Sequence, residues 1–119
     1  MNKISINWFE IPAMNVTRSA DFYGHVLNIT LGDMQSPDGL IKTFLNDETP
    51  MGAIVSGDQH VPAKEGSLIY LGVSDIDSAL ERVLQREGEI VLPKTSIGAF
   101  GFIAHFIDSE GNRVGLHSI

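Results

Sequence analysis

One pattern of hydrophobic and turn-forming residues occurs twice in this chain, the second copy about 60 positions after the first. Each copy has an alternating apolar run, a helix-capping residue, a stretch with helical periodicity and three further alternating runs. The aligned pairs are Ile11 with Leu71, Ala13 with Val73, Asn15 with Asp75, Phe44 with Phe106, Asn46 with Asp108, Glu48 with Glu110 and Ile54 with Leu116. The repeat predicts one domain over residues 1–119, built from two tandem βαβββ modules at 1–57 and 67–119 with a polar linker at 58–66.

The two helices have recognisable start signals. Asn15 and Asp75 are N-cap residue types, and they precede amphipathic stretches at 16–27 and 76–87. Gly88 follows the second stretch, where a left-handed C-terminal residue is expected. Strands are predicted at 4–13, 28–34, 40–45, 51–56, 68–73 and 89–92. One more strand is predicted on each side of a turn at 108–112, and a further turn is predicted at 36–39.

A βαβββ module covers only one face of its sheet with its helix, so the other face needs a second cover. Two modules can place their sheets side by side and curve them around a shared cleft, which gives an α+β fold with a curved mixed sheet. Side chains alternate along a strand, so Ile11, Leu71 and Leu116 are expected to face the helices. The residues of opposite parity, expected in the cleft, include Trp8, Glu10, Tyr70, Arg113, Gly115 and His117. The parity of His105 stays open.

Composition excludes several classes of function. The formal net charge is −7 and the pI is about 4.8, which argues against nucleic acid as a partner. The acidic balance serves solubility, or it suits a neutral or cationic small ligand. The chain has no cysteine, and hence no disulfide, thiolate nucleophile or zinc–thiolate site. No stretch reads as a membrane span or a signal peptide, so we expect a cytoplasmic protein without membrane partners.

Two motifs resemble the vicinal oxygen chelate superfamily, which includes glyoxalase I, bleomycin resistance proteins, fosfomycin resistance proteins and extradiol dioxygenases. The stretch at 15–23, NVTRSADFY, is similar to the helix start of that family. The turn at 108–112, DSEGN, is similar to its D-P-[DE]-G-N turn. With the duplicated βαβββ order, the resemblance covers nearly the whole chain and implies the glyoxalase/bleomycin resistance fold. It also implies a homodimer, because clefts in this family are often completed by dimerisation.

The metal enzymes of this family carry His, Glu or Gln ligands on the first, fourth, fifth and eighth strands. Counted from the two motifs and the repeat, those positions hold Trp8, Ala53, Leu68 and Gly115. None of these residues offers a side chain that binds a divalent cation. The resemblance therefore implies a member without a metal or other cofactor, in which the usual glyoxalase I and extradiol chemistry does not run.

Five cleft residues are candidates for ligand binding. Trp8 could stack on a planar or cationic ligand, or simply fill the cavity. Glu10 could act as a general base or bind a cationic group, or it could pair with Arg113 or reach solvent at the mouth of the cleft. His117 could perform general acid–base work or, with Glu10, form a displaced metal site, or it could be a hydrogen-bonded residue near an interface. Tyr70 and Arg113 could orient the polar end of a ligand, although Arg113 could also pair with a carboxylate.

Three functions remain open at this point. The first is a metal-independent binder of a small organic molecule, similar to bleomycin resistance proteins, which sequester their ligand. The second is an enzyme, a glyoxalase-type lyase or dioxygenase with Glu10 and His117 as displaced ligands. The third is a dimeric interaction module whose cleft is filled by packing. His25, near the end of the first helix, and His60, in the linker, are assigned no functional role.

Overall fold

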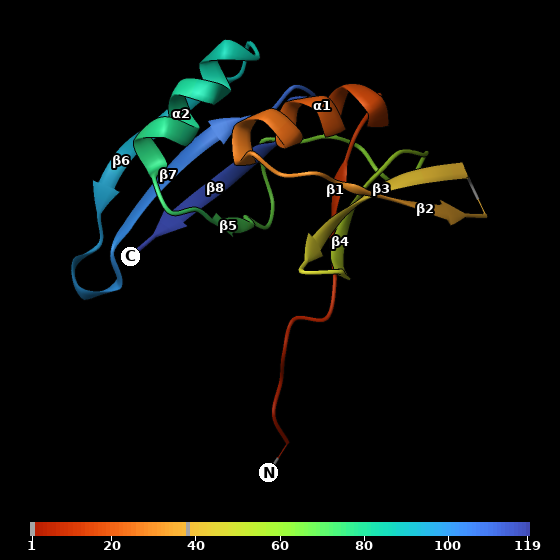
Figure 1. The fold of residues 1–119 in the computed structure, drawn as a ribbon, viewed down its shortest axis with the longest axis horizontal. Coiled ribbons are helices and arrows are strands. Elements are labelled where there is room, and N and C mark those ends of the chain that lie inside the picture. Colours follow the sequence, from red (N-terminus) through yellow and green to blue (C-terminus); the bar gives the residue numbers. More distant parts are fainter. Residues whose placement is uncertain (1, 38) are drawn as a thin grey trace.

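The computed structural model describes residues 2–37 and 39–119, and within them the chain forms eight strands, two α-helices and one 3₁₀ turn (Figure 1). In chain order these are β1 (Phe9–Pro12), α1 (Val16–Leu27), β2 (Gly32–Ser36), β3 (Gly39–Asn46), β4 (Thr49–Val55), β5 (Tyr70–Gly72), α2 (Ile76–Gln85), β6 (Glu89–Ser96), η1 (Gly98–Phe100), β7 (Phe102–Ile107) and β8 (Arg113–Ser118). The strands form two four-stranded sheets with orders β1-β4-β3-β2 and β5-β8-β7-β6. Strand β1 pairs parallel with β4, and β5 pairs parallel with β8. All other neighbouring strands are antiparallel. The predicted α+β class and the repeated βαβββ order are confirmed.

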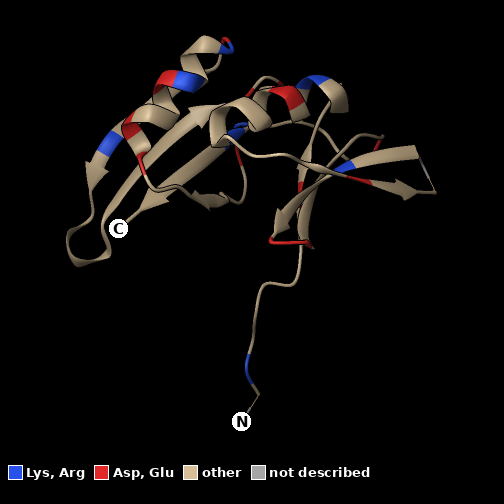
Figure 2. Ribbon diagram, in the orientation of Figure 1, with Lys and Arg blue, Asp and Glu red and all other residues tan. Residues whose placement is uncertain are grey.

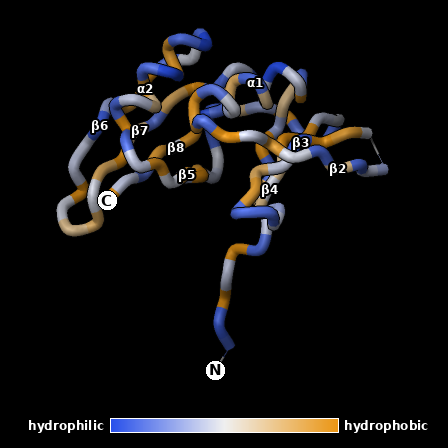
Figure 3. Tube along the Cα trace, viewed as in Figure 1, coloured by the Kyte–Doolittle hydropathy of each residue, from blue (hydrophilic) through white to orange (hydrophobic). Residues whose placement is uncertain are grey.

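Both helices lie on the same side of the two sheets (Figure 1). Helix α1 packs on β3 and β4, helix α2 packs on β6, β7 and β8, and the helices also contact each other. The core contains the residues predicted to face the helices, including Ile11, Leu71 and Leu116. Apolar residues recur along the strands of both sheets (Figure 3). One hydrophobic core therefore runs beneath both helices.

Aromatic side chains of α1 join the two halves of this core. The ring of Tyr23 lies 5.5 Å from that of Phe44 in the first sheet and 6.2 Å from that of Phe106 in the second. The neighbouring Phe22 lies 5.9 Å from Phe106. The first helix thus packs against both modules, beyond the contact with its own sheet that the repeat requires.

The closing turn (residues 108–112), between β7 and β8, also binds the first module. The Glu110 carboxylate accepts the backbone N–H groups of Met14 and Asn15 at 2.9 and 2.8 Å, just before α1. It also accepts two hydrogen bonds from the Arg18 guanidinium, at 2.6 and 2.9 Å. Burial by itself would raise the pKa of Glu110, but the hydrogen bonds from Arg18, Asn15 and Ser109 hold that pKa below its ordinary value. A carboxylate from the second module therefore binds the positive end of the first helix.

Asp108 and Asn112 extend this connection into the core. The buried Tyr23 hydroxyl donates to Asp108 Oδ2 at 2.6 Å. Burial, and then the negative charge of Asp108, raise the pKa of Tyr23 well above its ordinary value. The Asn112 amide donates to the carbonyl oxygen of Pro12 at 2.7 Å and accepts the backbone N–H of Ala63 at 3.0 Å. The closing turn consequently contacts α1, the end of β1 and the linker.

Several predicted boundaries were wrong for identifiable reasons. The first strand is limited to Phe9–Pro12, because β4 pairs with it only from Phe9 onward, and residues 2–8 extend away from the body (Figure 1). The second strand starts at Gly32, because Asn28 adopts a left-handed conformation and caps α1. The sixth strand continues to Ser96 as an edge strand with irregular pairing, which tolerates Pro93.

The two other turn predictions concern the end of α2 and residues 36–39. Helix α2 ends at Gln85, and Glu87 rather than Gly88 adopts the positive φ, of 64°. Gly88 is required for a different reason, since a Cβ there would lie 2.6 Å from Val83 Cγ1. The predicted turn at 36–39 includes Asp38, which lies outside the described residues.

No helix in the described part of the chain is both long and apolar enough to cross a membrane.

Candidate functional site

The polar candidate residues lie on the face of each sheet opposite the helices, which we call the open face. Their neighbours in sequence are core residues, so strand alternation turns these side chains the other way. The open face of the first sheet carries Glu10, and that of the second carries Tyr70, His105, Arg113 and His117. Charged residues lie on both helices and in several turns, whereas few lie on β7 and β8 (Figure 2).

On the first open face, Glu10 joins two other side chains, and we call Trp8, Glu10 and His60 the Glu10 group. The Trp8 indole N–H donates to Glu10 Oε2 at 3.3 Å, and His60 Nε2 lies 2.9 Å from Glu10 Oε1. Trp8 is 38% exposed, so its ring is available to a ligand. His60 was missed from the sequence because the linker has no periodicity that would place it over β1.

On the second open face, three residues form a connected set, and we call Tyr70, His105 and Arg113 the Tyr70 triad. The Tyr70 hydroxyl lies 2.7 Å from His105 Nε2. On the other side of the ring, Arg113 approaches His105 Nδ1 with its terminal nitrogen at 2.7 Å and with Nε at 3.3 Å. Burial, and then the positive charge of Arg113, lower the pKa of His105 below its ordinary value.

The triad answers two questions that the sequence left open. His105 belongs to the open face, because its neighbours Ala104 and Phe106 are buried in the core. Arg113 bonds to His105, while Glu10 bonds to Trp8 and His60, so the alternative pairing of Glu10 with Arg113 is wrong. The triad could have been anticipated once the register placed Tyr70 opposite Gly115 and Gly115 opposite His105.

His117 has a separate partner. Its Nε2 lies 2.6 Å from the backbone carbonyl oxygen of Phe100. A carbonyl oxygen only accepts, so Nε2 donates and Nδ1 is the free acceptor. The structure thus places the two predicted ligands of a displaced metal site, Glu10 and His117, on different sheets with different hydrogen-bond partners.

The positions of the family's metal ligands do not fit a metal in this chain. Ala53 is fully buried and has no donor atom. Gly115 has no side chain, and a Cβ there would lie 2.5 Å from Tyr70 Cδ1, so the tyrosine ring fills that space. Within residues 2–37 and 39–119, no group of three or more His, Cys, Asp or Glu residues gathers to hold an ion. We therefore derive no chemistry through a metal at these positions.

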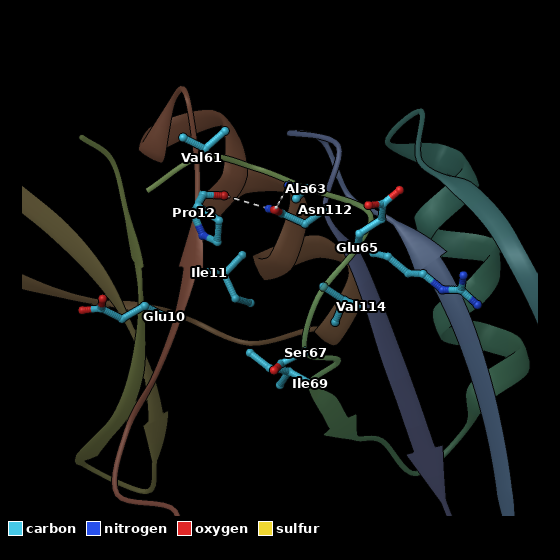
Figure 4. A pocket seen from close by; sticks show the side chains of 11 residues that line it. Glu10, Ile11, Pro12, Val61, Ala63, Glu65, Ser67, Ile69, Asn112 and Val114 are labelled. Atoms are coloured by element: carbon cyan, nitrogen blue, oxygen red, sulfur yellow. Dashed lines mark hydrogen bonds between the residues drawn. The ribbon is translucent and has the colours of Figure 1, made fainter. Parts of the chain in front are cut away.

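A cavity of about 160 Å³ lies between the two modules. Figure 4 shows Ile11 from β1 facing Ile69 and Val114 across this cavity, with the Glu10 carboxylate turned away from them. The cavity is lined by Glu10, Ile11, Pro12, Val61, Ala63, Glu65, Ser67, Ile69, Asn112, Arg113 and Val114. Cavities that hold drug-sized ligands usually measure about 300–1,000 Å³. The inter-module cavity alone is therefore too small for such a ligand.

Two hollows of about 370 and 390 Å³ lie on the helix side. Their arginines already bind oxygen atoms of the protein, at Glu110, Asp21 and Val26. Neither hollow is lined, among the residues that the structure describes, by an exposed aromatic side chain on which a ring could stack, because Phe22 is buried, so the open faces remain the candidate site.

Comparison with known proteins gives a consistent result. The family model described as Glyoxalase/Bleomycin resistance protein/Dioxygenase superfamily matches residues 5–116. A "Glyoxylase-like domain-containing protein" from Didymella fabae is 30% identical over 116 residues, covering 90% of this chain and 88% of the relative. The "Anthracycline biosynthesis protein DnrV" from Streptomyces peucetius is 25% identical, and its alignment covers 87% of this chain but only 43% of the relative. The chain thus spans less than half the length of that second relative.

A solved structure agrees with the observed architecture. TnmS3, described as an antibiotic binding protein from Streptomyces sp. CB03234, superposes with a TM-score of 0.67. The match covers 99% of this chain and 98% of TnmS3, with 21% sequence identity. At that identity the superposition supports the fold alone.

Proposed function

The chain belongs to the Glyoxalase/Bleomycin resistance protein/Dioxygenase superfamily, and from this premise we propose that it binds a small organic molecule on the open faces of its sheets. The observation that carries the proposal is the pair of polar groups on those faces. The Glu10 group offers a carboxylate beside a partly exposed indole, and the Tyr70 triad offers a phenol backed by a guanidinium. A ligand with a ring and a polar end could use both groups.

The binding requires no divalent metal in this proposal. In support, the positions where the family's metal enzymes carry ligands hold Trp8, Ala53, Leu68 and Gly115. Trp8 supplies only an indole N–H donor, and the space beside Gly115 is filled by the ring of Tyr70. Trp8 and Tyr70 then contact the ligand through ring stacking and hydrogen bonds.

A homodimer completes the site. In support, the cavity within one chain is small, at about 160 Å³, while Trp8 and Tyr70 are 38% and 44% exposed. A second copy placed against the open faces would enclose a ligand between aromatic side chains from both protomers. Sedimentation velocity at micromolar concentration tests this point, and a monomer whose mass is unchanged by the ligand would contradict it.

The names of two similar proteins suggest the ligand class to try first. One is an antibiotic binding protein and the other an anthracycline biosynthesis protein. We propose an aromatic natural product of this kind, and an anthracycline antibiotic is the first probe. Isothermal titration calorimetry should show saturable binding, weakened by Trp8→Ala because the stacking surface is lost.

Two controls make this test decisive. Leu84→Ala alters an exposed apolar residue of α2, on the helix side of the sheets and away from the open faces, and should leave the affinity unchanged. Metal analysis of protein purified without chelator should find no stoichiometric divalent ion. A bound metal that disappears in Glu10→Gln or His117→Ala would contradict the metal-independent proposal and favour an enzyme with displaced ligands. Equal affinities of wild type and Trp8→Ala would contradict the proposed stacking role.

A further inference from the structure

We propose that the Tyr70 triad is a hydrogen-bond relay that fixes the Tyr70 hydroxyl as a donor toward the ligand. The second open face then selects molecules that present an acceptor oxygen, such as a carbonyl, quinone or phenolate oxygen. This inference rests on the proposed binding function and specifies the chemistry that the ligand needs at one point.

The relay starts at Arg113, whose guanidinium can only donate hydrogen bonds. Its terminal nitrogen lies 2.7 Å from His105 Nδ1, so Nδ1 must be the unprotonated, accepting nitrogen. The neutral imidazole therefore carries its proton on Nε2. A doubly protonated ring would direct an N–H at the guanidinium, and both the burial of His105 and the charge of Arg113 lower the pKa of His105 accordingly.

The second step fixes the direction of the bond to tyrosine. Since Nε2 carries the proton, it donates to the Tyr70 hydroxyl oxygen over 2.7 Å. A phenol that accepts one hydrogen bond still has its own O–H to donate. Among the described residues, the Tyr70 hydroxyl has no other hydrogen-bond partner, and 44% of the residue is exposed. Its O–H is therefore available to a molecule bound on the open face.

The third step concerns the position of the ring. Tyr70 lies over Gly115, and a Cβ at Gly115 would lie 2.5 Å from Tyr70 Cδ1 and 2.6 Å from Cε1. The ring thus packs on bare backbone, while the hydroxyl is held by His105. A donor fixed at both ends loses little conformational freedom when it binds an oxygen atom. It also disfavours a ligand ammonium group at this point, because Arg113 adds positive charge behind it.

The relay changes the interpretation of two residues. The sequence suggested that Arg113 orients the ligand directly, whereas in the structure it acts through His105 and is a positioning residue. His105, which the sequence left without an assigned face, connects the charge to the hydroxyl. Of the three triad residues, Tyr70 alone contacts the ligand in this arrangement.

The relay can be tested first in the free protein. Two-dimensional ¹H–¹⁵N NMR of the histidine side chains reports which imidazole nitrogen carries the proton. We expect His105 as the Nε2–H tautomer at neutral pH, and a mixture of tautomers in Arg113→Met. His117, whose Nε2 bonds to a backbone carbonyl, serves as the internal reference and should not change. An Nδ1–H tautomer or a charged ring at His105 would overturn the relay, whatever the ligand proves to be.

The ligand chemistry is tested with a matched pair of soluble probes, (anthraquinon-2-ylmethyl)trimethylammonium and (anthracen-2-ylmethyl)trimethylammonium. Both carry the same cationic group, which has no acceptor oxygen, and they differ at the two ring positions that bear the quinone carbonyls. In calorimetry we expect wild-type protein to bind the quinone about five- to tenfold more tightly, the usual effect of one hydrogen bond. Tyr70→Phe should abolish this ratio, and Arg113→Met should reduce it. Trp8→Ala should weaken both probes alike and preserve the ratio.

The outcomes separate the two proposals. Equal binding of both probes by wild type would overturn the relay's selectivity and leave the proposed binding function standing. Binding of neither probe would overturn the proposed function for aromatic ligands and the relay's role in it, while the NMR result would still decide the hydrogen-bond direction. A preserved ratio in Tyr70→Phe would overturn the assignment of Tyr70 as the donor.

Discussion

Glutamate 110 offers the sharpest test of how the two modules are connected. Its carboxylate is fully inaccessible and binds the backbone N–H groups of Met14 and Asn15 together with Arg18. The substitution Glu110→Gln preserves the size of the side chain and removes its charge. The new amide must also direct an N–H toward groups that are themselves donors.

The expected loss can be worked out from these contacts. Hydrogen bonds to a charged group contribute about 1.5–3 kcal/mol, and loss of a helix N-terminal cap costs about 0.5–2 kcal/mol. The Arg18 side chain is 55% exposed, so solvent screens its share. Both backbone N–H groups bond to Oε1, so the glutamine carbonyl can keep these two bonds, although without the negative charge. The amide nitrogen replaces Oε2, which accepts from Arg18 Nε and from the Ser109 hydroxyl, so those two bonds are lost. We therefore expect the free energy of unfolding to fall by about 2 kcal/mol.

Urea unfolding monitored by far-ultraviolet circular dichroism measures this loss. The repeat supplies a matched control, since Glu48 occupies the corresponding turn of the first module and is exposed. Glu48→Gln makes the same chemical change without those contacts, so it should alter the free energy of unfolding by less than about 0.5 kcal/mol.

The pH dependence gives a second check on the same variant. The pKa of Glu110 is depressed in the folded protein, so its stabilisation is present above the ordinary pKa of 4.5 and is lost as pH falls through the depressed value. The stability difference between wild type and Glu110→Gln should therefore shrink in acid. The reasoning is refuted if Glu110→Gln and Glu48→Gln unfold at the same urea concentration at pH 7.

Three other results are expected. Gly115→Ala should destabilise the fold by about 1–3 kcal/mol in urea unfolding, because the added Cβ overlaps the Tyr70 ring. Gly72→Ala, which has open space around the added Cβ, should leave the stability unchanged, and equal effects of the two variants would contradict the packing. Tyr23→Phe should cost about 1–2 kcal/mol in the same assay, because Asp108 loses a buried donor, and an unchanged midpoint would count against that bond. Because the pKa of Tyr23 is raised, Tyr23 stabilises the folded state fully below pH 10, and this stabilisation is lost as the pH rises further. The wild-type protein should therefore lose stability in alkali more steeply than Tyr23→Phe. Parallel pH profiles of the two proteins would exclude this explanation.

The parts of the fold that local chemistry determines could be predicted from the sequence. Helix α1 has the predicted bounds, because Asn15 accepts the N–H of Arg18 at its start and the left-handed Asn28 ends it. Strand parity was predictable for the same kind of reason, since apolar residues such as Ile11 and Leu116 can be buried on only one face. The repeat then supplied the order of the elements.

Contacts between distant segments could not be predicted in this way. Residues 4–8 alternate like a strand, but a strand also needs a neighbour, and the pairing of β1 with β4 begins only at Phe9, opposite Gly52. His60 reaches Glu10 because the linker crosses the first sheet, and no local pattern encodes that path. The direction of His105 depends on the register of β7 against β8, which a single strand does not reveal.

The bonds from Glu110 to Met14 and Asn15 span 96 and 95 positions of the chain, and this has a consequence for protein synthesis. The ribosome releases the first helix long before it makes the residue that binds the start of that helix. Until then, the backbone N–H groups of Met14 and Asn15, just before α1, have only water as a partner. The nascent first half therefore waits in a less stable form, and its maturation is timed by the translation of the second half. Slow or truncated translation of the codons for residues 108–112 should accordingly be detected first as protease sensitivity around residues 14–18.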